Sequence, residues 1–329
     1  MIRRAWSWLD ESPRRTKGIR CLQIAAGVMI CFRVATEWPF ADYLWGPHGV
    51  TRGLERGAPF DWLAALSARV FASALGTRAV LLALLLGSLG LVAGIRTRLA
   101  TLVALVAFYL LEVRFPELLD GGDNILRLSL IYMLLLLPAE ARPSPRTLRV
   151  WLHNIGVCAI SAQVIVLYLT AGFAKAFGQR WSQGTALYLV SQVEYFSTPG
   201  LVREMFKNPA FTTLATYATM FFQVWFPVAM LSKLKIPWLA VGVCFHLMVA
   251  FFMGLFPFST IMIGLELFLV SDEEYESLAR RAAPHAKRLA AAGRDVASRF
   301  RRGEVSPAQK TAPAPIDAGA DPRRIGERE

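Results

Sequence analysis

Residues 78–95 read RAVLLALLLGSLGLVAGI, and Arg78 at their start is the one charged side chain among them. A helix needs about 20 mostly apolar residues to cross the hydrocarbon layer of a bilayer. Arg96 and Arg98 follow the run directly. An apolar run of this length with basic residues at its ends is typical of a transmembrane helix. This stretch therefore predicts a membrane span.

The composition of the whole chain agrees with a membrane protein. Of its 329 residues, 55% are hydrophobic and 18% are charged, against about 25% charged residues in soluble domains. The formal net charge is +12, but the basic residues flank apolar segments and do not alternate with aromatic residues on one soluble face. The charge therefore indicates membrane topology, and we expect no nucleic-acid partner.

Apolar segments like the first one recur along the chain. They lie at 19–38, 78–95, 99–116, 125–139, 153–176, 210–231, 236–254 and 256–271. Basic residues occupy every second short connection, at 96–98, 142–149 and 233–235. Because cytoplasmic loops carry the excess of Lys and Arg, this pattern predicts an all-α protein of the plasma membrane with about eight transmembrane helices and both termini in the cytoplasm.

The segments outside these spans predict further helices. The two longer outer connections, 39–77 and 177–209, contain amphipathic stretches near 60–75 and 184–195 that are suited to the membrane interface. We expect three regions in total. These are a transmembrane domain at 1–271, a basic amphipathic helix at 272–302 on the anionic inner leaflet, and a disordered tail at 303–329.

The cysteines form no metal-binding or disulfide pattern. Cys21, Cys31, Cys158 and Cys244 lie inside apolar runs, without a CxxC motif or a Cys/His cluster. We expect them to be small apolar packing residues, and we expect no metal site.

Polar side chains at membrane depth are candidates for a functional site, because a charge there costs about 2.5–3.5 kcal/mol on insertion scales. The predicted topology places such side chains from five helices in the outer half of the membrane. They are Arg33, Glu37, Glu112, Arg114, Asp123, Asn124, Arg127, Lys175 and His246. Structural ion pairs or side chains that reach the interface are the alternative, and His246 is also compatible with a hydrogen-bonded core residue.

Lys175 has a distinctive sequence context. It follows the small residues Thr170, Ala171 and Gly172 and precedes Trp181. Small residues let helices approach closely, so we expect Lys175 to lie within the protein. Shielding from water disfavours the ammonium form of lysine, as a general base requires.

Several stretches, taken in order, resemble one family. They are TEW at 36–38, WGPHG at 45–49, GGDNILR at 121–127, YLTAGFAK at 168–175 with Trp181 and GTALY at 184–188, and CFH at 244–246. This set resembles the HTTM (horizontally transferred transmembrane domain) family over about residues 18–271. The family includes the membrane part of vitamin K-dependent gamma-carboxylase.

The resemblance implies a chemistry. Lys175 is similar in position to the carboxylase lysine taken as the base that deprotonates a reduced naphthoquinone, which then reacts with O2 so that CO2 can add to a glutamate. His246 would hydrogen-bond the quinol or an intermediate. The carboxylase has an Asn-Asn-His-Ser-like stretch where this chain reads DNILR, so its histidine has no counterpart here. The residues that would line the same outer cavity are Arg33, Asp123, Asn124, Arg127 and Trp181.

Three classes of function follow from these patterns. The first is a membrane enzyme that modifies an exported peptide, protein or lipid. The second is a non-catalytic partner, such as an immunity or maturation factor for an exported peptide. The third is a transporter, although the polar residues gather on one side of the membrane and no inverted repeat is visible. Replacement of Lys175 distinguishes the first two, and substrate flux tests the third.

Overall fold

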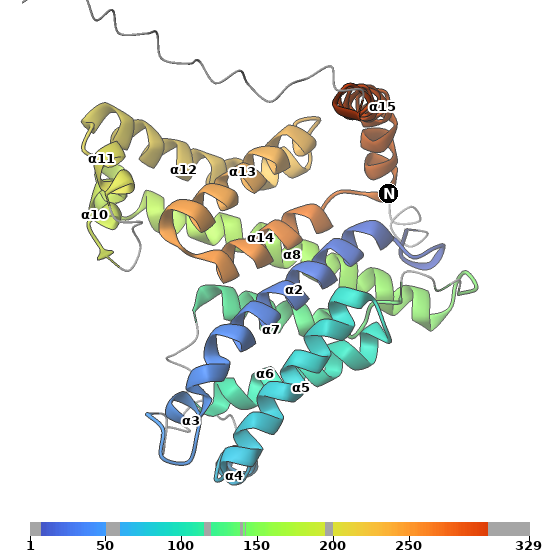
Figure 1. Ribbon diagram of the computed structural model, residues 1–329, viewed down its shortest axis with the longest axis vertical. Helices are drawn as coiled ribbons and strands as arrows, with labels where there is room; N and C mark the ends of the chain where they lie inside the picture. Colours follow the sequence, from blue (N-terminus) through green and yellow to red (C-terminus); the bar gives the residue numbers. More distant parts are fainter. Residues whose placement is uncertain are drawn as a thin grey trace, which may run out of the picture. The chain divides into compact units, whose positions relative to one another are not determined.

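The computed structural model describes residues 8–50, 60–114, 120–138, 141, 143–194 and 200–301. The regular structure of these residues is entirely helical, so the predicted all-α class is confirmed (Figure 1). Each of the eight predicted segments contains a helix. The helices are α2 (Thr16–Glu37), α5 (Ala74–Ala93), α6 (Thr97–Arg114), α7 (Gly121–Met133), α8 (Leu148–Ala176), α12 (Pro209–Met230), α13 (Lys235–Met253) and α14 (Phe256–Phe268).

Within the described residues, four helical stretches are long and apolar enough to cross a membrane by themselves. They are Thr16–Leu44, Ala74–Ala93, Leu148–Ala176 and Lys235–Met253. The chain is therefore a membrane protein with at least these candidate spans. The helix Phe256–Phe268 is apolar but shorter.

The connections hold short helices. They are η1 (Trp38–Phe40), α3 (Ala41–Leu44), α4 (Asp61–Val70), α9 (Gln179–Ser182), α10 (Ala186–Ser191) and α11 (Leu201–Phe206). The predicted amphipathic stretches 60–75 and 184–195 thus contain α4 and α10, which are both shorter than predicted. Ser73 explains one boundary, because its side chain accepts a hydrogen bond from the backbone N–H of Gly76 and caps a new helix.

Small residues set the closest helix contacts. α2 packs against α5 on one side and α14 on the other, and α8 packs against α12 (Figure 1). A Cβ added at Gly27 of α2 would lie 2.7 Å from the Ser88 carbonyl oxygen of α5. One added at Gly264 of α14 would lie 2.4 Å from the Ala25 Cβ. These glycines let the backbones approach as membrane helices commonly do.

On one side of the bundle, arginine side chains donate hydrogen bonds to the free carbonyl oxygens at helix ends. Arg15 donates to the carbonyl oxygens of Phe268 (3.2 Å) and Leu269 at the end of α14. Arg20 donates to Leu91 (2.5 Å) at the end of α5, and Arg98 to Leu136 (2.9 Å) just after α7. The starts of α2 and α6 therefore lie beside the ends of α5, α7 and α14, as alternating antiparallel helices require.

The same side is tied to the N-terminal segment. The Asn154 side chain near the start of α8 donates to the carbonyl oxygens of Leu9 and Ser12, both at 2.9 Å, and accepts from the Arg14 N–H at 3.1 Å. His153 Nδ1 accepts from the Leu137 N–H at 2.9 Å. The start of α8 therefore lies on the same side of the bundle as the starts of α2 and α6.

The chain divides into two compact units after Tyr275. α15 (Asp272–Arg301) begins in the first unit, where Asp272 accepts hydrogen bonds from the backbone N–H groups of Thr16 and Lys17 at 2.9 Å each. The rest of α15 belongs to the second unit. The segment 303–329, predicted to be disordered, lies outside the described residues.

Candidate functional site

A buried polar cluster joins three helices of the bundle. The Tyr168 hydroxyl of α8 lies 2.9 Å from His246 Nε2 of α13 and donates a hydrogen bond to Glu266 Oε1 of α14. His246 Nε2 and Glu266 Oε1 are 3.7 Å apart. The exposed fractions of the three residues are 1%, 2% and 0%. We call Tyr168, His246 and Glu266 the core cluster.

Aromatic rings enclose the core cluster. Tyr168 stacks on Phe226 of α12 with ring centroids 3.9 Å apart. The His246 ring contacts the rings of Phe245 and Phe258, at centroid distances of 5.1 and 5.7 Å. An apolar surrounding of this kind strengthens the electrostatic interactions among the polar groups.

A glycine makes room for the carboxyl group. A Cβ added at Gly242 of α13 would lie 2.2 Å from Glu266 Oε1. His246 is one turn further along α13, so the glycine and the histidine lie on the same helix face. The backbone of α13 thus holds the carboxyl group against Tyr168 and His246.

The hydrogen-bond geometry constrains the protons. Tyr168 has one hydroxyl proton, which it donates to Glu266. The contact between its oxygen and His246 Nε2 then requires a proton on Nε2, so that the imidazole donates. The opposite arrangement is equally well formed, with a protonated Glu266 donating to Tyr168 and Tyr168 donating to Nε2. The cluster can therefore hold its protons in two orientations.

Two polar atoms of the core cluster have no hydrogen-bond partner in the described part of the chain. They are His246 Nδ1 and Glu266 Oε2, which are both buried. Buried polar atoms are nearly always hydrogen-bonded, and exceptions call for an explanation such as a catalytic role. A ligand or an ordered water is the kind of partner that such atoms normally take.

Lys175 lies in a different environment. Its Nζ is 3.4 Å from the Ala171 carbonyl oxygen and 5.2 Å from the centre of the Trp181 ring. The side chain is half-buried and forms no ion pair with a described residue. Gly172 packs closely on α12, where a Cβ would lie 2.9 Å from the Val224 nitrogen, so the predicted close approach of helices is present.

The structure does not bring Lys175 into contact with His246. Lys175 is seven residues beyond Tyr168 on α8, which corresponds to about 10 Å along the helix axis at 1.5 Å per residue. The contacts of Lys175 are with Ala171 and Trp181, whereas those of His246 are with the core cluster and its rings. The two predicted catalytic residues thus occupy separate levels of one helix bundle.

The remaining predicted cavity residues form ion pairs at the other end of α2. Arg33 lies 2.5 Å from Asp123 and 2.8 Å from Glu37. Trp45 Nε1 donates to Glu37 at 3.0 Å. Asp123 also completes a capping box with Asp120 at the start of α7. We call Arg33, Glu37 and Asp123 the α2–α7 ion cluster.

A second pair lies beside it. Arg127 donates to Glu112 of α6 and, at 2.7 Å, to the side-chain oxygen of Asn124. Arg114 donates to the Gly46 carbonyl oxygen at 3.3 Å. All these side chains have protein partners, as structural pairs do, and none of their described contacts is with the core cluster.

Residues 139–272 match the family model of the HTTM domain. The match covers less than half of the chain, and we call the matched residues the HTTM domain. It contains all three residues of the core cluster as well as Lys175 and Trp181. The α2–α7 ion cluster lies outside the matched residues.

A curated relative extends the comparison without naming an activity. The uncharacterized protein YitO of Bacillus subtilis (strain 168) is 29% identical over 165 residues, which cover 45% of this chain and 52% of that protein. The chain therefore spans about half the length of the relative it matches. No solved structure matches the chain.

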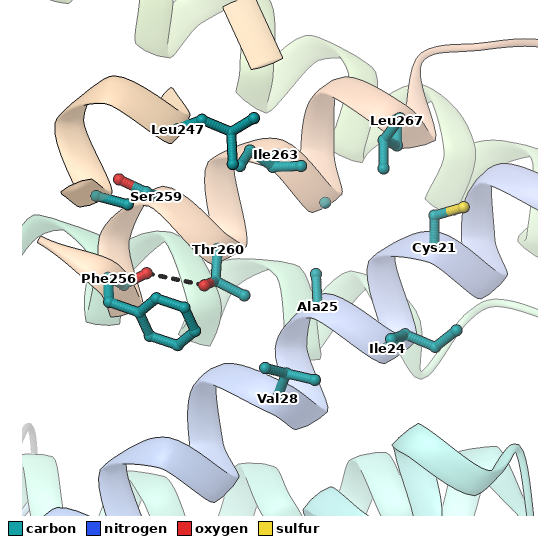
Figure 2. A pocket seen from close by; sticks show the side chains of 12 residues that line it. Cys21, Ile24, Ala25, Val28, Leu247, Phe256, Ser259, Thr260, Ile263 and Leu267 are labelled. Carbon is teal, nitrogen blue, oxygen red and sulfur yellow. Dashed lines mark hydrogen bonds between the residues drawn. The ribbon is translucent and has the colours of Figure 1, made fainter. Parts of the chain in front are cut away.

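An apolar groove borders the HTTM domain on its α14 side. It has a volume of about 330 Å³ and lies among α2, α13 and α14. Figure 2 shows Ile24, Ala25 and Val28 of α2 across from Ile263 of α14, with the Thr260 hydroxyl bonded to the Phe256 carbonyl oxygen at 2.8 Å. No charged residue lines the groove among the described residues, and most of its lining is apolar, so it suits apolar groups.

Two core-cluster residues of the HTTM domain were not among the predicted site residues. Tyr168 entered only as part of a motif, and Glu266 was not singled out. Glu266 is the one charged side chain in the apolar segment 256–271. The rule that a charge at membrane depth needs a reason would have identified it.

Proposed function

We propose that this protein is a multi-pass enzyme of the plasma membrane whose HTTM domain carries out acid–base chemistry on an exported peptide, protein or lipid. The observation that carries the proposal is the core cluster. A carboxyl group, an imidazole and a phenol lie together in an apolar bundle, and two of their proton-binding atoms have no described protein partner. Polar groups at such depth are costly and are usually retained for function.

The proposed topology has eight spans with both termini in the cytoplasm. Arg15, Arg20 and Arg98 all lie on the side where α2 and α6 begin and α5, α7 and α14 end. An excess of basic residues marks the cytoplasmic side. On this topology Lys175, at the end of α8, lies toward the outer face, where an exported substrate is accessible.

The core cluster is proposed to move protons. A proton taken up at His246 Nδ1 is balanced by release of the Nε2 proton to the Tyr168 oxygen. Tyr168 in turn passes its own proton to Glu266 Oε1. At the end the imidazole and the phenol are neutral again, and the carboxylate has become a carboxylic acid. In the reverse sequence Glu266 returns a proton to Tyr168, Tyr168 passes its proton to Nε2, and Nδ1 releases its proton, so the cluster can serve as acid or base.

Lys175 is proposed as the group that takes the substrate proton near the outer face. Its amine has no described acidic partner to neutralise it, and the Trp181 ring lies beside it. These surroundings fit a weakly acidic aromatic hydroxyl such as that of a reduced naphthoquinone. When bound, such a quinol would supply reducing equivalents for a reaction with O2, and CO2 would be the second substrate in a carboxylation.

The proposal is tested by comparing membranes that contain the wild-type protein with membranes that contain variants. Mass spectrometry of co-purified peptides and lipids identifies the product that depends on the wild-type protein. Tyr168→Phe keeps the ring stack on Phe226 but removes the oxygen that links His246 and Glu266, and Lys175→Met removes the amine. Both are expected to abolish product formation.

A matched control comes from α12. Tyr217 donates its hydroxyl to the Ser182 carbonyl oxygen at 2.7 Å and is partly exposed, so Tyr217→Phe is expected to preserve the product. Unchanged product formation by Tyr168→Phe and Lys175→Met would contradict the enzyme proposal and favour a non-catalytic partner.

A further inference from the structure

One face of α12 carries a stripe of buried polar residues. Thr212, Thr216, Thr219 and Gln223 follow one another at spacings of four, three and four residues, which places them on one side of the helix. Their exposed fractions are 4%, 0%, 9% and 7%. We call these four residues the α12 stripe. Such a stripe is unusual on a helix that otherwise suits an apolar environment.

The α12 stripe leads toward the core cluster. A Cβ at Gly172 of α8 would lie 3.2 Å from the Gln223 carbonyl carbon. Tyr168, one turn before Gly172, stacks on Phe226, which is three residues after Gln223. Gln223 is therefore about one turn, roughly 6 Å, outward from the core cluster along the helices. At the other end, α12 contacts α9 and α10.

Two members of the stripe have atoms that lack partners. The Thr212 and Thr219 hydroxyls donate to the carbonyl oxygens of Phe206 (2.7 Å) and Ala215 (2.9 Å). By contrast, Thr216 Oγ1 and Gln223 Oε1 are buried without a partner in the described part of the chain. His246 Nδ1 and Glu266 Oε2 of the core cluster also lack a partner among the described residues.

We infer that the α12 stripe is a hydrated proton path between the outer side of the bundle and the core cluster. Buried polar atoms that the chain does not satisfy are normally satisfied by ordered water, which needs two to four polar partners. Water between Thr216, Gln223 and His246 Nδ1 would hand protons inward, with one O–H or N–H bond forming as the next breaks. This inference rests on the acid–base role proposed for the core cluster.

The test is the rate at which the Glu266 carboxyl group exchanges its proton for deuterium. Purified protein in lipid is held at a pH at which the carboxylic-acid stretching band of Glu266 is visible, identified by its loss in Glu266→Gln. After transfer to deuterated buffer, the shift of this band is followed by infrared spectroscopy. Thr216→Val and Gln223→Met, which remove polar atoms at nearly constant volume, are each expected to slow the shift about tenfold, equivalent to about 1.4 kcal/mol in the barrier.

The matched control is Thr101→Val on α6. Thr101 is 1% exposed and donates to the Thr97 carbonyl oxygen at 2.7 Å. The variant therefore loses a buried hydroxyl but leaves the α12 stripe unchanged. Equal exchange rates in all three variants and the wild type would overturn the path.

Thermal unfolding of each variant identifies any change in fold. Thr216→Ser keeps the hydroxyl, so its exchange rate is expected to equal that of the wild type. Loss of the path leaves the proposed function standing, because that function is judged by product formation in Tyr168→Phe.

Discussion

Gly242 of α13 and Glu266 of α14 approach so closely that any side chain at position 242 would occupy the space of the carboxyl group, with a Cβ only 2.2 Å from Oε1. The glycine and the glutamate are 24 positions apart in the chain and belong to consecutive helices. The contact ties the position of the carboxyl group to the packing of these two helices. A change at Gly242 therefore acts on the core cluster without removing any of its polar atoms.

Gly242→Ala is expected to displace the Glu266 carboxyl group and weaken its contact with Tyr168. Overpacking of this kind typically costs about 1–3 kcal/mol, and we expect both a lower thermal unfolding midpoint and loss of product formation. Gly121→Ala is the control, because a Cβ there has nothing within 4 Å. A Gly242→Ala protein with wild-type unfolding and activity would show that the carboxyl group does not depend on this contact.

Arg33→Met is expected to destabilise the protein without a specific role in chemistry. The change leaves Glu37 and Asp123 near each other without the guanidinium that lies between them. Removal of one partner from a buried ion pair costs about 3–5 kcal/mol, whereas removal of both is much milder. Arg33→Met combined with Asp123→Asn should therefore recover much of the lost stability in a thermal unfolding assay. A stable but inactive Arg33→Met protein would instead indicate that Arg33 takes part in the reaction.

Glu274, in the first turn of α15, is expected to stabilise the fold only above acidic pH. Its burial raises the pKa, but hydrogen bonds from Lys235 and from the Ser271 N–H outweigh burial and lower the pKa below its ordinary value of 4.5. A carboxyl group with a depressed folded pKa contributes stability that is present above the unfolded pKa and is lost as pH falls through the folded one.

Glu274→Gln should therefore lower the unfolding midpoint at neutral pH, and the difference from wild type should disappear as the pH falls below 4.5. Glu276→Gln provides a control, since Glu276 pairs with Arg280 in a largely exposed position and such pairs contribute little. A pH-independent difference between Glu274→Gln and wild type would mean that packing, and not charge, explains the effect.

Much of the fold could be predicted because hydropathy is a local property. Each predicted apolar segment contains a helix, and the predicted 210–231 matches α12 (Pro209–Met230) within one residue at each end. The start of α8 was predicted at 153 but lies at Leu148. Arg149 makes that first turn polar, so hydropathy alone does not include it. His153 is nevertheless buried, because it bonds to the N-terminal segment.

The candidate site was predictable only in part, since it depends on which helix faces meet. His246 was singled out as a lone histidine on an apolar helix, and the structure supplies its partners from α8 and α14. Sequence spacing cannot pair Tyr168 with Glu266, which are 98 positions apart. The predicted topology likewise placed Arg33 and Lys175 together in the outer half of the membrane. In the structure, Arg33 contacts Asp123 of α7, whereas Lys175 contacts Trp181 of α9.

The most direct test of the central claim is product formation by Glu266→Gln. The amide can still accept the hydrogen bond from Tyr168 and fills the same space beside Gly242, but it cannot take up a proton. We predict a protein with near wild-type thermal unfolding that forms no product, with Glu204→Gln, an exposed partner of Lys207, as the active control. Product formation at the wild-type rate by Glu266→Gln would contradict the account, because a proton could then not be passing to this carboxyl group.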